Sequence, residues 1–479
     1  MKMPIALLAG LVFASACTST LTVDRLDDDP AASACLEGVP NDCSLRGAVR
    51  NANARPGLDT VVLPSIDPQY PTSYTLAIPG ADEDGAATGD LDVTDDLVVK
   101  GEPRTSELDG SELVPVISAY GMLDRIWDVD PSDAGVSLTV SDLVLAFGDV
   151  SGSAVFPHGG VIRNRPHGTL TLKRCTLFAA AIVAPTAVAG GVVFNQGLVQ
   201  IHDSHVEGGL ATRGGAIANG DGESALAGGA VSIDGTTIDL SYAVPPPFLQ
   251  DAAGSFEGGA VYNEAQGTVL VERSTLTQNG AAVGGAIANH GELVVRESLV
   301  HENFGGTITP TGPTCGPGGG IANFGTLGLT NSTLTANTGG CAQRQADAGL
   351  HNVGQAVLQN VSLVDNGISN PSGTTELANT LIARSGCVGA GFASDGGNLE
   401  GPLSTCGLDQ GCDLVGVANP NLGALAANGG PTRTHALLAG SPALDHGLAL
   451  TCPATDQRGQ PRSDGACDTG AFERTPADG

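Results

Sequence analysis

Apolar and polar residues alternate in one pattern that recurs along most of the chain. Two apolar positions lie two residues apart, a small residue follows three positions later, and another apolar residue comes two positions after that. The first apolar position is occupied by Leu170, Val199, Val231, Val269, Leu293, Leu327 and Ala356, and the small position by Cys175, Ser204, Thr236, Ser274, Ser298, Ser332 and Val361. Apolar pairs of period two predict short strands. The three-residue step predicts a bend that keeps both strands facing one core.

A glycine-rich motif precedes each copy of this pattern. Copies such as "GGVIRN" and "GGAIAN" end at Asn164, Asn195, Asn219, Asn263, Asn289 and Asn323, and a decayed copy, "AGLHN", ends at Asn352. The spacing varies from 24 to 44 residues, so the unit carries insertions of different length. Gly-Gly favours a turn with positive φ, and we expect the asparagines to stack and to bond neighbouring backbones.

These repeats predict an all-β fold, a parallel β-helix. A single coil cannot bury its own apolar face, but coils stacked about 4.8 Å apart form a continuous core. We place the β-helix at residues 86–385, which is roughly ten to twelve coils of about 25 residues each. Opposite charges on neighbouring coils, Glu272 with Arg296 and Arg273 with Glu297, would favour the correct register from the outside.

The first residues indicate export. The stretch "MKMPIALLAGLVFASAC" has a lysine, a short apolar run and small residues before Cys17, which predicts a signal peptide over 1–16 and lipid attachment at Cys17. A linker would follow over 17–34. The formal charge of −30 disfavours a nucleic-acid partner, and the 41 % hydrophobic content excludes a disordered chain. We therefore expect a monomer at the outer membrane or cell surface, held to the cell envelope by lipid, or otherwise secreted.

Both ends of the chain carry recognisable motifs. "CSLRGAVRNANARPGLDTVVL" (43–63) resembles the CSLREA-type domain, with Gly47 where that motif has Glu. The repeats followed by "LTQN", "LVHEN" and "LTAN" resemble polymorphic outer-membrane proteins, and "LGALAANGGPTRTHALLAGSPALDHG" looks like the choice-of-anchor Q domain. The resemblance implies a right-handed β-helix surface protein with adhesive or structural roles. It implies an N-terminal capping region at 35–85, a C-terminal module at 386–473 and a tail at 474–479.

The N-terminal capping region should contain a short helix. Ser44 can cap it, and Leu45, Ala48, Val49 and Ala52 share one face. This helix would cover the unpaired edge of the first coil, and the C-terminal module would do the same at the other end.

The cysteines of an exported chain are expected to form disulfides. Cys175 is an exception, because it occupies the inward small position and should be a buried free thiol. Three pairs follow from the residues: Cys315–Cys341, which are about one coil apart, and Cys35–Cys43 and Cys452–Cys467 within the two end regions. Cys387, Cys406 and Cys412 form an odd trio, in which the resemblance favours Cys387–Cys406.

The strongest cluster of chemical groups is "IHDSHVEGG" (201–209). His202, Asp203 and His205 should lie outward or at the bend, with Lys173 and Asp234 beside His202 on neighbouring coils. Such groups could bind a metal or transfer protons. Any strand with polar outward residues gives the same spacing, so we favour a solvated outer face.

Other histidines and acids are weaker candidates. His290 and His301 should fall in turns without an acidic partner at catalytic spacing. His435, Asp445 and His446 lie near Ser441, which lacks the context of a nucleophile elbow. The acidic stretch "GDLDVTDD" (89–96) could hold Ca²⁺, but it lacks the glycine-rich nonapeptide of calcium-binding β-helices, so solvation of the column's edge is the favoured role. No other cofactor is indicated.

Two classes of function remain. The first is a non-enzymatic surface protein that binds a polysaccharide or protein ligand. The alternative is a carbohydrate-active enzyme, a polysaccharide lyase or glycoside hydrolase, which needs clustered acids and usually aromatic side chains that stack on sugars. Trp127 is the only tryptophan, and the insertion at 240–257 is the best candidate for a binding loop.

Overall fold

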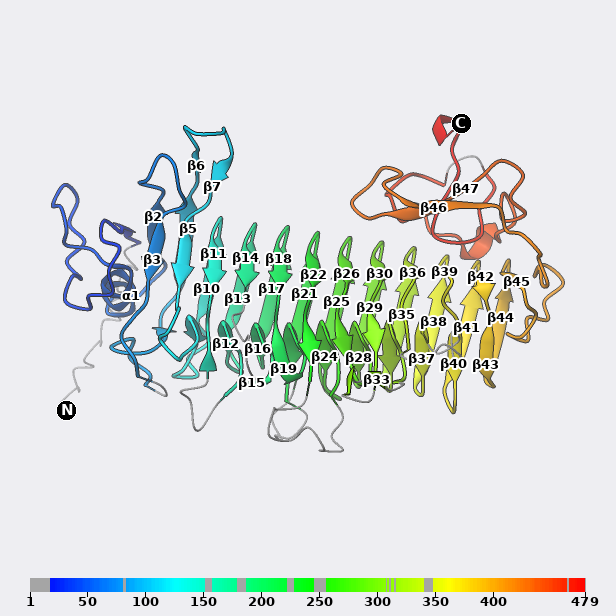
Figure 1. Cartoon of the computed structure of the whole chain (residues 1–479), viewed down its shortest axis with the longest axis horizontal. Coiled ribbons are helices and arrows are strands. Elements are labelled where there is room, and N and C mark those ends of the chain that lie inside the picture. Colours follow the sequence, from blue (N-terminus) through cyan, green and yellow to red (C-terminus); the bar gives the residue numbers. More distant parts are fainter. Residues whose placement is uncertain are drawn as a thin grey trace, which may run out of the picture.

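The computed structural model describes residues 18–478, apart from residues 81–82, 151–156, 179–186, 222–227, 245–255, 307, 310–311, 314–315, 340–347 and 463–464. Over the described residues the chain winds into a right-handed parallel β-helix, in which strands of successive coils pair side by side (Figure 1). The predicted fold class is confirmed. The paired strands run beyond the predicted range 86–385, because β2 at one end and β44 and β45 at the other belong to the same sheets.

Three long parallel sheets form the walls of the column. Sheet 1 contains β1 (Thr20–Thr22), β2 (Asp59–Pro64), β5 (Leu97–Glu102), β10 (Ser137–Ser141), β13 (Thr169–Lys173), β17 (Leu198–His202), β21 (Ala230–Asp234), β25 (Thr268–Glu272), β29 (Glu292–Arg296), β35 (Thr326–Thr330), β38 (Gln355–Gln359), β41 (Thr374–Ala378) and β44 (Phe392–Gly396). Sheet 2 contains β3 (Ser73–Thr75), β8 (Val116–Ser118), β11 (Val144–Ala146), β14 (Thr176–Phe178), β18 (His205–Glu207), β22 (Thr237–Asp239), β26 (Thr275–Thr277), β30 (Leu299–His301), β36 (Thr333–Thr335), β39 (Ser362–Val364), β42 (Leu381–Ser385) and β45 (Leu399–Pro402).

Sheet 3 completes each coil. It contains β4 (Leu91–Val93), β9 (Trp127–Val129), β12 (Ile162–Asn164), β16 (Val193–Asn195), β20 (Ile217–Asn219), β24 (Val261–Asn263), β28 (Ile287–Asn289), β34 (Ile321–Asn323), β37 (Leu350–Asn352), β40 (Ile368–Asn370) and β43 (Cys387–Gly389). A shorter sheet 4 lies between sheets 2 and 3 along the chain, with β15 (Ala187–Ala189), β19 (Leu210–Arg213), β23 (Tyr242–Ala243), β27 (Gly280–Ala281) and β31 (Phe304–Gly305).

The remaining elements lie outside these sheets. They are the helix α1 (Leu45–Asn53), the antiparallel pairs β6 (Arg104–Thr105) with β7 (Glu112–Leu113), β32 (Ile308–Thr309) with β33 (Gly312–Pro313) and β46 (Leu422–Ala426) with β47 (Thr434–Leu437), and the short 3₁₀ helices Ala449–Thr451 and Pro476–Asp478. No helix among the described residues is long and apolar enough to cross a membrane.

The asparagines of the glycine motif form the expected ladder. Asn164, Asn195, Asn219, Asn263, Asn289 and Asn323 each donate through Nδ2 to Oδ1 of the next asparagine along the column, over 2.7–2.9 Å. All of these amides are fully buried. Because every donor meets an acceptor of the same kind, the coils stack in one register.

Both glycines of the motif are required, for different reasons. In the copy before Asn289, Gly284 has a φ of +64°, which disfavours residues with a Cβ. A Cβ on Gly285 would lie 2.3 Å from the carbonyl oxygen of Gly319 on the next coil. The first glycine therefore makes the turn, and the second lets two coils approach.

The three-residue step is the bend between sheets 1 and 2. Residues at this bend adopt the left-handed conformation, for example Asp203 with φ +48°, Arg273 with +46° and Glu297 with +50°. The small residue that follows points inward, and the hydroxyl of Ser298 accepts from the backbone N–H of Ser274 over 3.1 Å. Cys175 occupies this inward column and donates its own N–H to Ser204 Oγ.

Helix α1 packs against the first coil as predicted, but the edge of β2 is paired by β1, a strand within the predicted linker 17–34. Ser44 Oγ accepts from the N–H of Gly47 over 2.9 Å, and Ala48, Val49 and Ala52 are buried against the core. A Cβ on Gly47 would lie only 1.9 Å from the carbonyl oxygen of Ala32. Position 47, where the CSLREA-type motif has glutamate, therefore leaves no room for a side chain in this protein.

The C-terminal module does more than close the last coil. Leu414 pairs with Leu399 at the end of the column, but the rest of the module folds back along the outer face of sheet 2 (Figure 1). Thr333 donates to Gln457 over 2.6 Å, and Asn331 donates to the carbonyl of Thr455 over 2.7 Å. The expectation that this module only covers the terminal edge was therefore too narrow.

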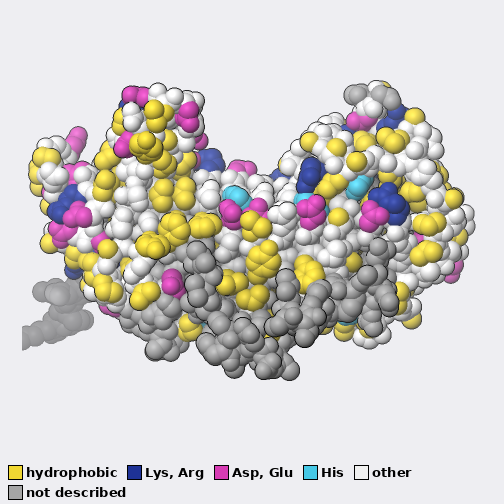
Figure 2. All heavy atoms as spheres, in the orientation of Figure 1, with side chains coloured by type: hydrophobic (Ala, Val, Ile, Leu, Met, Phe, Trp, Pro, Cys, Tyr) yellow, Lys and Arg dark blue, Asp and Glu magenta, His cyan; other side chains and the backbone are white. Residues whose placement is uncertain are grey.

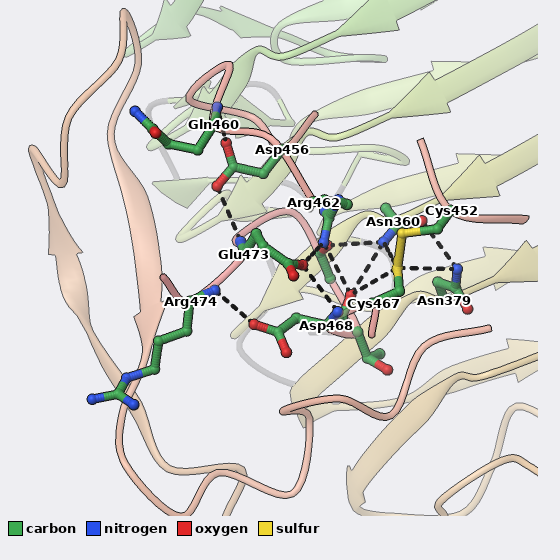
Figure 3. A network of polar contacts seen from close by, with 12 residues as sticks. Asn360, Asn379, Cys452, Asp456, Gln460, Arg462, Cys467, Asp468, Glu473 and Arg474 are labelled. Carbon is green, nitrogen blue, oxygen red and sulfur yellow. Dashed lines mark hydrogen bonds and ion pairs between the residues drawn. A yellow bond between two sulfur atoms is a disulfide. The ribbon is translucent and has the colours of Figure 1, made fainter. Parts of the chain in front are cut away.

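A polar network holds the module together. Figure 3 shows the Cys452–Cys467 disulfide beside Asn360 of the column, with Arg462 pointing toward Glu473. Arg462 Nη1 and Glu473 Oε2 are 2.5 Å apart, and both side chains are buried. Burial raises the pKa of Glu473 to about 7.

Candidate functional site

Along the outer face of sheet 2, the described chain rises above the strands at two places. The β6–β7 hairpin rises at one end and the C-terminal module at the other, and Figure 2 shows a dip between them where a histidine and acidic side chains gather. We call the outward side chains of β11, β14, β18, β22 and β26, together with Tyr120 and Phe147, the saddle. The strand register places Phe178, Glu207, Asp239 and Thr277 in one row across it.

A histidine and two acids meet at the centre of the saddle. His205 Nε2 lies 2.9 Å from Asp239 Oδ1, and the ligand atoms of His205, Glu207 and Asp239 all lie within 4.8 Å of one another. The hydrogen bond with Asp239 raises the pKa of His205 above its ordinary value. This group can accept and donate a proton, and its polar atoms can form hydrogen bonds with a ligand.

An aromatic row leads to these charged groups. Tyr120 and Phe147 are in edge contact with ring centroids 5.7 Å apart, and Phe147 and Phe178 follow at 5.5 Å. Phe178 pairs in register with Glu207 on the next strand. Since Tyr120 is 75 % exposed, the row presents ring surface to solvent directly beside hydrogen-bonding groups.

The structure divides the four predicted residues between two faces and a bend. His202 and Asp234 lie on the outer face of sheet 1, with Nδ1 and Oδ2 3.8 Å apart, whereas His205 is on sheet 2. Asp203 occupies the bend between these sheets. Asp234 also accepts from Arg273 over 2.6 Å. The predicted set therefore does not converge on a single centre.

Sequence reasoning missed Asp239 and Glu207 as partners of His205. Both follow the inward apolar residue of the second strand by one position, so the repeat register contains the signal that pairs them. The aromatic row was missed because Tyr120 and Phe147 lie in coils that precede the first glycine motif.

His290 and His301 differ from the expectation. His290 lies 2.5 Å through Nε2 from Oε2 of Glu257, a residue of the predicted binding insertion, and stacks on Phe324 at 4.6 Å. The prediction that His290 has no close acidic partner was therefore wrong, because the insertion returns to the column at Glu257. Most of that insertion, residues 245–255, lies outside the described residues.

His301 ends strand β30 and does not lie in a turn. Its Nε2 accepts from Arg433 Nη2 of the C-terminal module over 2.8 Å, and its side chain is 3 % exposed. Burial, together with the charge of Arg433, lowers the pKa of His301 to about 4. The residue is part of the contact between module and column.

The C-terminal histidines and Ser441 do not form a catalytic arrangement. Ser441 Oγ donates to the carbonyl of Pro420 over 2.7 Å, while His435 contacts Gly423 O at 2.9 Å and Thr335 Oγ1 at 3.2 Å. His435 and Ser441 therefore bond to different partners, and His435 helps to hold the module on sheet 2.

The acidic stretch 89–96 is partly buried, which contradicts the expected role in edge solvation. Asp90 and Asp92 are at most 2 % exposed, and Asp92 Oδ2 accepts from the backbone N–H of Ala86 in the segment before β4. Asp90 Oδ2 accepts from Arg125 over 2.8 Å. Burial raises the pKa of Asp92 to about 8.

Three disulfides join cysteines that were paired from the sequence. They are Cys35–Cys43, Cys387–Cys406 and Cys452–Cys467. Among the described cysteines, Cys175 and Cys412 are unbonded. Burial raises the pKa of the Cys175 thiol to about 11. Cys17, Cys315 and Cys341 lie outside the described residues, so their predicted roles stay predictions.

Comparison with known proteins finds a low structural similarity to two polysaccharide lyases. No family model and no curated protein matches the sequence. Among solved structures, pectate lyase Pel9A aligns with a TM-score of 0.45 and 13 % identity, over 95 % of this chain and 96 % of that one. The PL6 family alginate lyase AlyGC aligns with a TM-score of 0.37 and 10 % identity, over 90 % of this chain and 59 % of that one. Neither alignment assigns a substrate or a catalytic residue to this chain.

Proposed function

We propose that this protein is an exported cell-surface β-helix that binds an extended saccharide chain along the saddle, without chemical turnover. The observation that carries the proposal is the row Tyr120, Phe147 and Phe178, which ends at His205, Glu207 and Asp239. Exposed rings stack on the apolar faces of sugars, and the adjacent polar groups accept and donate hydrogen bonds to hydroxyls.

The saddle suits a linear ligand. Strand pairing repeats about every 4.8 Å, so the register from the coil of Tyr120 to that of Asp239 spans roughly 19 Å. The raised ends limit the ligand to a path between the β6–β7 hairpin and the C-terminal module (Figure 2). A protein ligand would need contacts with these raised ends as well.

Surface attachment is part of the proposal. The signal-like residues 1–16, the lipid site at Cys17 and the resemblance to CSLREA and choice-of-anchor Q proteins support it, and the three disulfides suit an oxidising compartment. Mass spectrometry of the N-terminal peptide should find a diacylglyceryl-modified Cys17. A Cys17→Ser variant should leave the membrane fraction, and an unmodified mature N-terminus would contradict lipid attachment.

Binding can be tested with immobilised polysaccharides. Phe178→Ala should weaken binding about tenfold, because buried ring contacts commonly contribute more than 1 kcal/mol. Leu450→Ala is the matched control, since Leu450 is 97 % exposed on the C-terminal module. Equal affinity of the two variants for the polysaccharide would show that the ligand does not bind at Phe178.

A second candidate function is cleavage of the polysaccharide, as by a lyase or glycoside hydrolase. The hydrogen-bonded pair of His205 and Asp239, with Glu207 close by, supplies groups for general acid–base chemistry. Incubation with uronate-containing and neutral polysaccharides would reveal unsaturated products or new reducing ends. Turnover by the parent chain that His205→Gln abolishes would establish this candidate over simple binding.

A further inference from the structure

A cluster of charged side chains is buried at the N-terminal end of sheet 3. The outward positions of β4, β9 and β12 are Asp92, Asp128 and Arg163, which pair directly in register. They are 0 %, 1 % and 7 % exposed. The chain that connects β3 to β4 adds Asp84, and Arg165 follows β12.

The arginines of this cluster converge on Asp128. Arg165 Nη2 lies 2.7 Å from both Asp128 Oδ2 and Asp84 Oδ1, Arg125 Nη1 lies 3.5 Å from Asp128, and Arg163 Nη1 lies 3.8 Å from it. The guanidinium groups of Arg125, Arg163 and Arg165 thus lie among four buried carboxylates, Asp90, Asp92, Asp124 and Asp128, with the more exposed Asp84 at the edge. A surplus of negative charge away from water is unfavourable unless a cation or protons offset it.

Asp92 points to where a cation would lie. Its Oδ2 accepts from the N–H of Ala86 over 2.6 Å, whereas its buried Oδ1 has no hydrogen-bond partner among the described residues. One carboxylate oxygen from each of Asp84, Asp92 and Asp128 lies within 4.8 Å of the others. Calcium binds oxygen ligands at about 2.3–2.6 Å, so oxygens around one ion are separated by up to about 5 Å.

We propose that Asp84, Asp92 and Asp128 bind a divalent cation of the calcium type, with water completing its coordination. The donors are all oxygens, which favours calcium over zinc. Asp84 is 59 % exposed, so it gives the ion a route to the cluster, and Arg165 must move aside because it contacts Asp84 and Asp128.

The cation joins the N-terminal cap to the column. Arg46 of α1 donates to the carbonyls of Ala86, Gly89 and Asp90, so the helix already holds the segment that carries Asp84. Asp128 belongs to the second strand of sheet 3. Binding at these three acids therefore links the capping segment to two successive coils, independently of any ligand on the saddle.

The only tryptophan offers a direct probe. Trp127 precedes Asp128 and is fully buried, so excitation of this residue should sensitise Tb³⁺ luminescence when Tb³⁺ takes the calcium site. The mature full-length chain, treated with a chelator, should show saturable emission that added Ca²⁺ displaces. Thermal unfolding should shift upward with Ca²⁺.

Single substitutions distinguish binding at this site from binding at other acidic residues. Asp92→Asn should lower Tb³⁺ affinity at least tenfold, and the control Asp133→Asn should leave it unchanged, because Asp133 lies in an exposed turn paired with His167. Asp84→Asn tests the site with a partly exposed residue, should Asp92→Asn fail to fold. Arg165→Gln should strengthen binding by removing the competing guanidinium. Absence of Trp127-sensitised emission, or emission unaltered by both aspartate variants, would overturn the site.

Discussion

The middle of the column and its N-terminal end satisfy buried polar groups in different ways. In the middle, each buried asparagine bonds to another asparagine one coil away, as Asn263 does to Asn289 over 2.7 Å. At the N-terminal end of the same sheet, the strand position one residue before the ladder carries Asp92, Asp128 and Arg163, whose partners are unlike groups from several segments. Repetition thus gives register, and the two proposed binding sites lie where the coils depart from repetition.

The largest expected effect tests the close approach of coils in the middle. Gly285→Ala would place a Cβ 2.3 Å from Gly319 O and 2.4 Å from Phe304 O, both backbone atoms, so we expect a loss of about 4 kcal/mol or more, or failure to fold. Chemical denaturation measures it. Gly328→Ala is the control, since a Cβ there meets nothing within 4 Å. Comparable stability of the two variants would contradict the stacking described.

Each asparagine of the ladder should contribute somewhat less to the free energy of unfolding than Gly285 does. Asn289→Ala removes the acceptor for Asn263 and the donor to Asn323, so each of these buried amides loses one hydrogen bond. We expect the free energy of unfolding to fall by about 2–4 kcal/mol. Gln355→Ala, on an exposed position of sheet 1, should change the free energy of unfolding by less than about 0.5 kcal/mol. A small effect of Asn289→Ala would mean that the ladder results from the stacking of the coils and does not stabilise it.

At the C-terminal end, the contact at His301 should depend on pH. Its pKa is lowered from the ordinary 6.5 to about 4, so the unfolded chain binds a proton first as pH falls. The contribution to stability is complete above pH 6.5 and is lost between pH 6.5 and 4, by about 3 kcal/mol at most. Hydrogen exchange at β47 should rise over that range. In His301→Gln this pH dependence should disappear, and its persistence would assign it to another group.

The smallest effect concerns the saddle. Asp239 raises the pKa of His205, so any stability from this pair is present below the ordinary histidine pKa and fades as pH rises through the raised value. NMR titration should place His205 above 6.5, and Asp239→Asn should bring it back toward that value. An unchanged midpoint in Asp239→Asn would show that the pair does not form in solution.

The repeat pattern was sufficient to predict the parts of the fold in which coils are alike. The inward Cys175, the asparagine ladder and the helix capped by Ser44 all follow from fixed spacing or local capping, which act over one coil or less. The bend at Asp203 was predictable for the same reason, because three residues are needed to turn one apolar pair relative to the next.

Sites formed by variable segments could not be predicted in this way. Glu257 reaches His290 only because a long insertion returns to the column at one particular coil. The burial of Asp92 depends on a covering segment without periodicity. Contacts such as Thr333 with Gln457 join residues 124 apart in sequence, and no local pattern encodes where the C-terminal module comes to rest.

The asparagine ladder has a direction and a defined start, since Asn164 Oδ1 accepts no bond within the described residues while each later Oδ1 accepts from the coil before. Each internal coil of the ladder therefore makes the same asparagine hydrogen bond with the coil before it and with the coil after it. Loss or gain of one whole internal coil upstream of β30 would leave no amide of this ladder unmatched. Each such change would alter the open length of the saddle by about 4.8 Å, so the length of the proposed saccharide site would follow the number of coils.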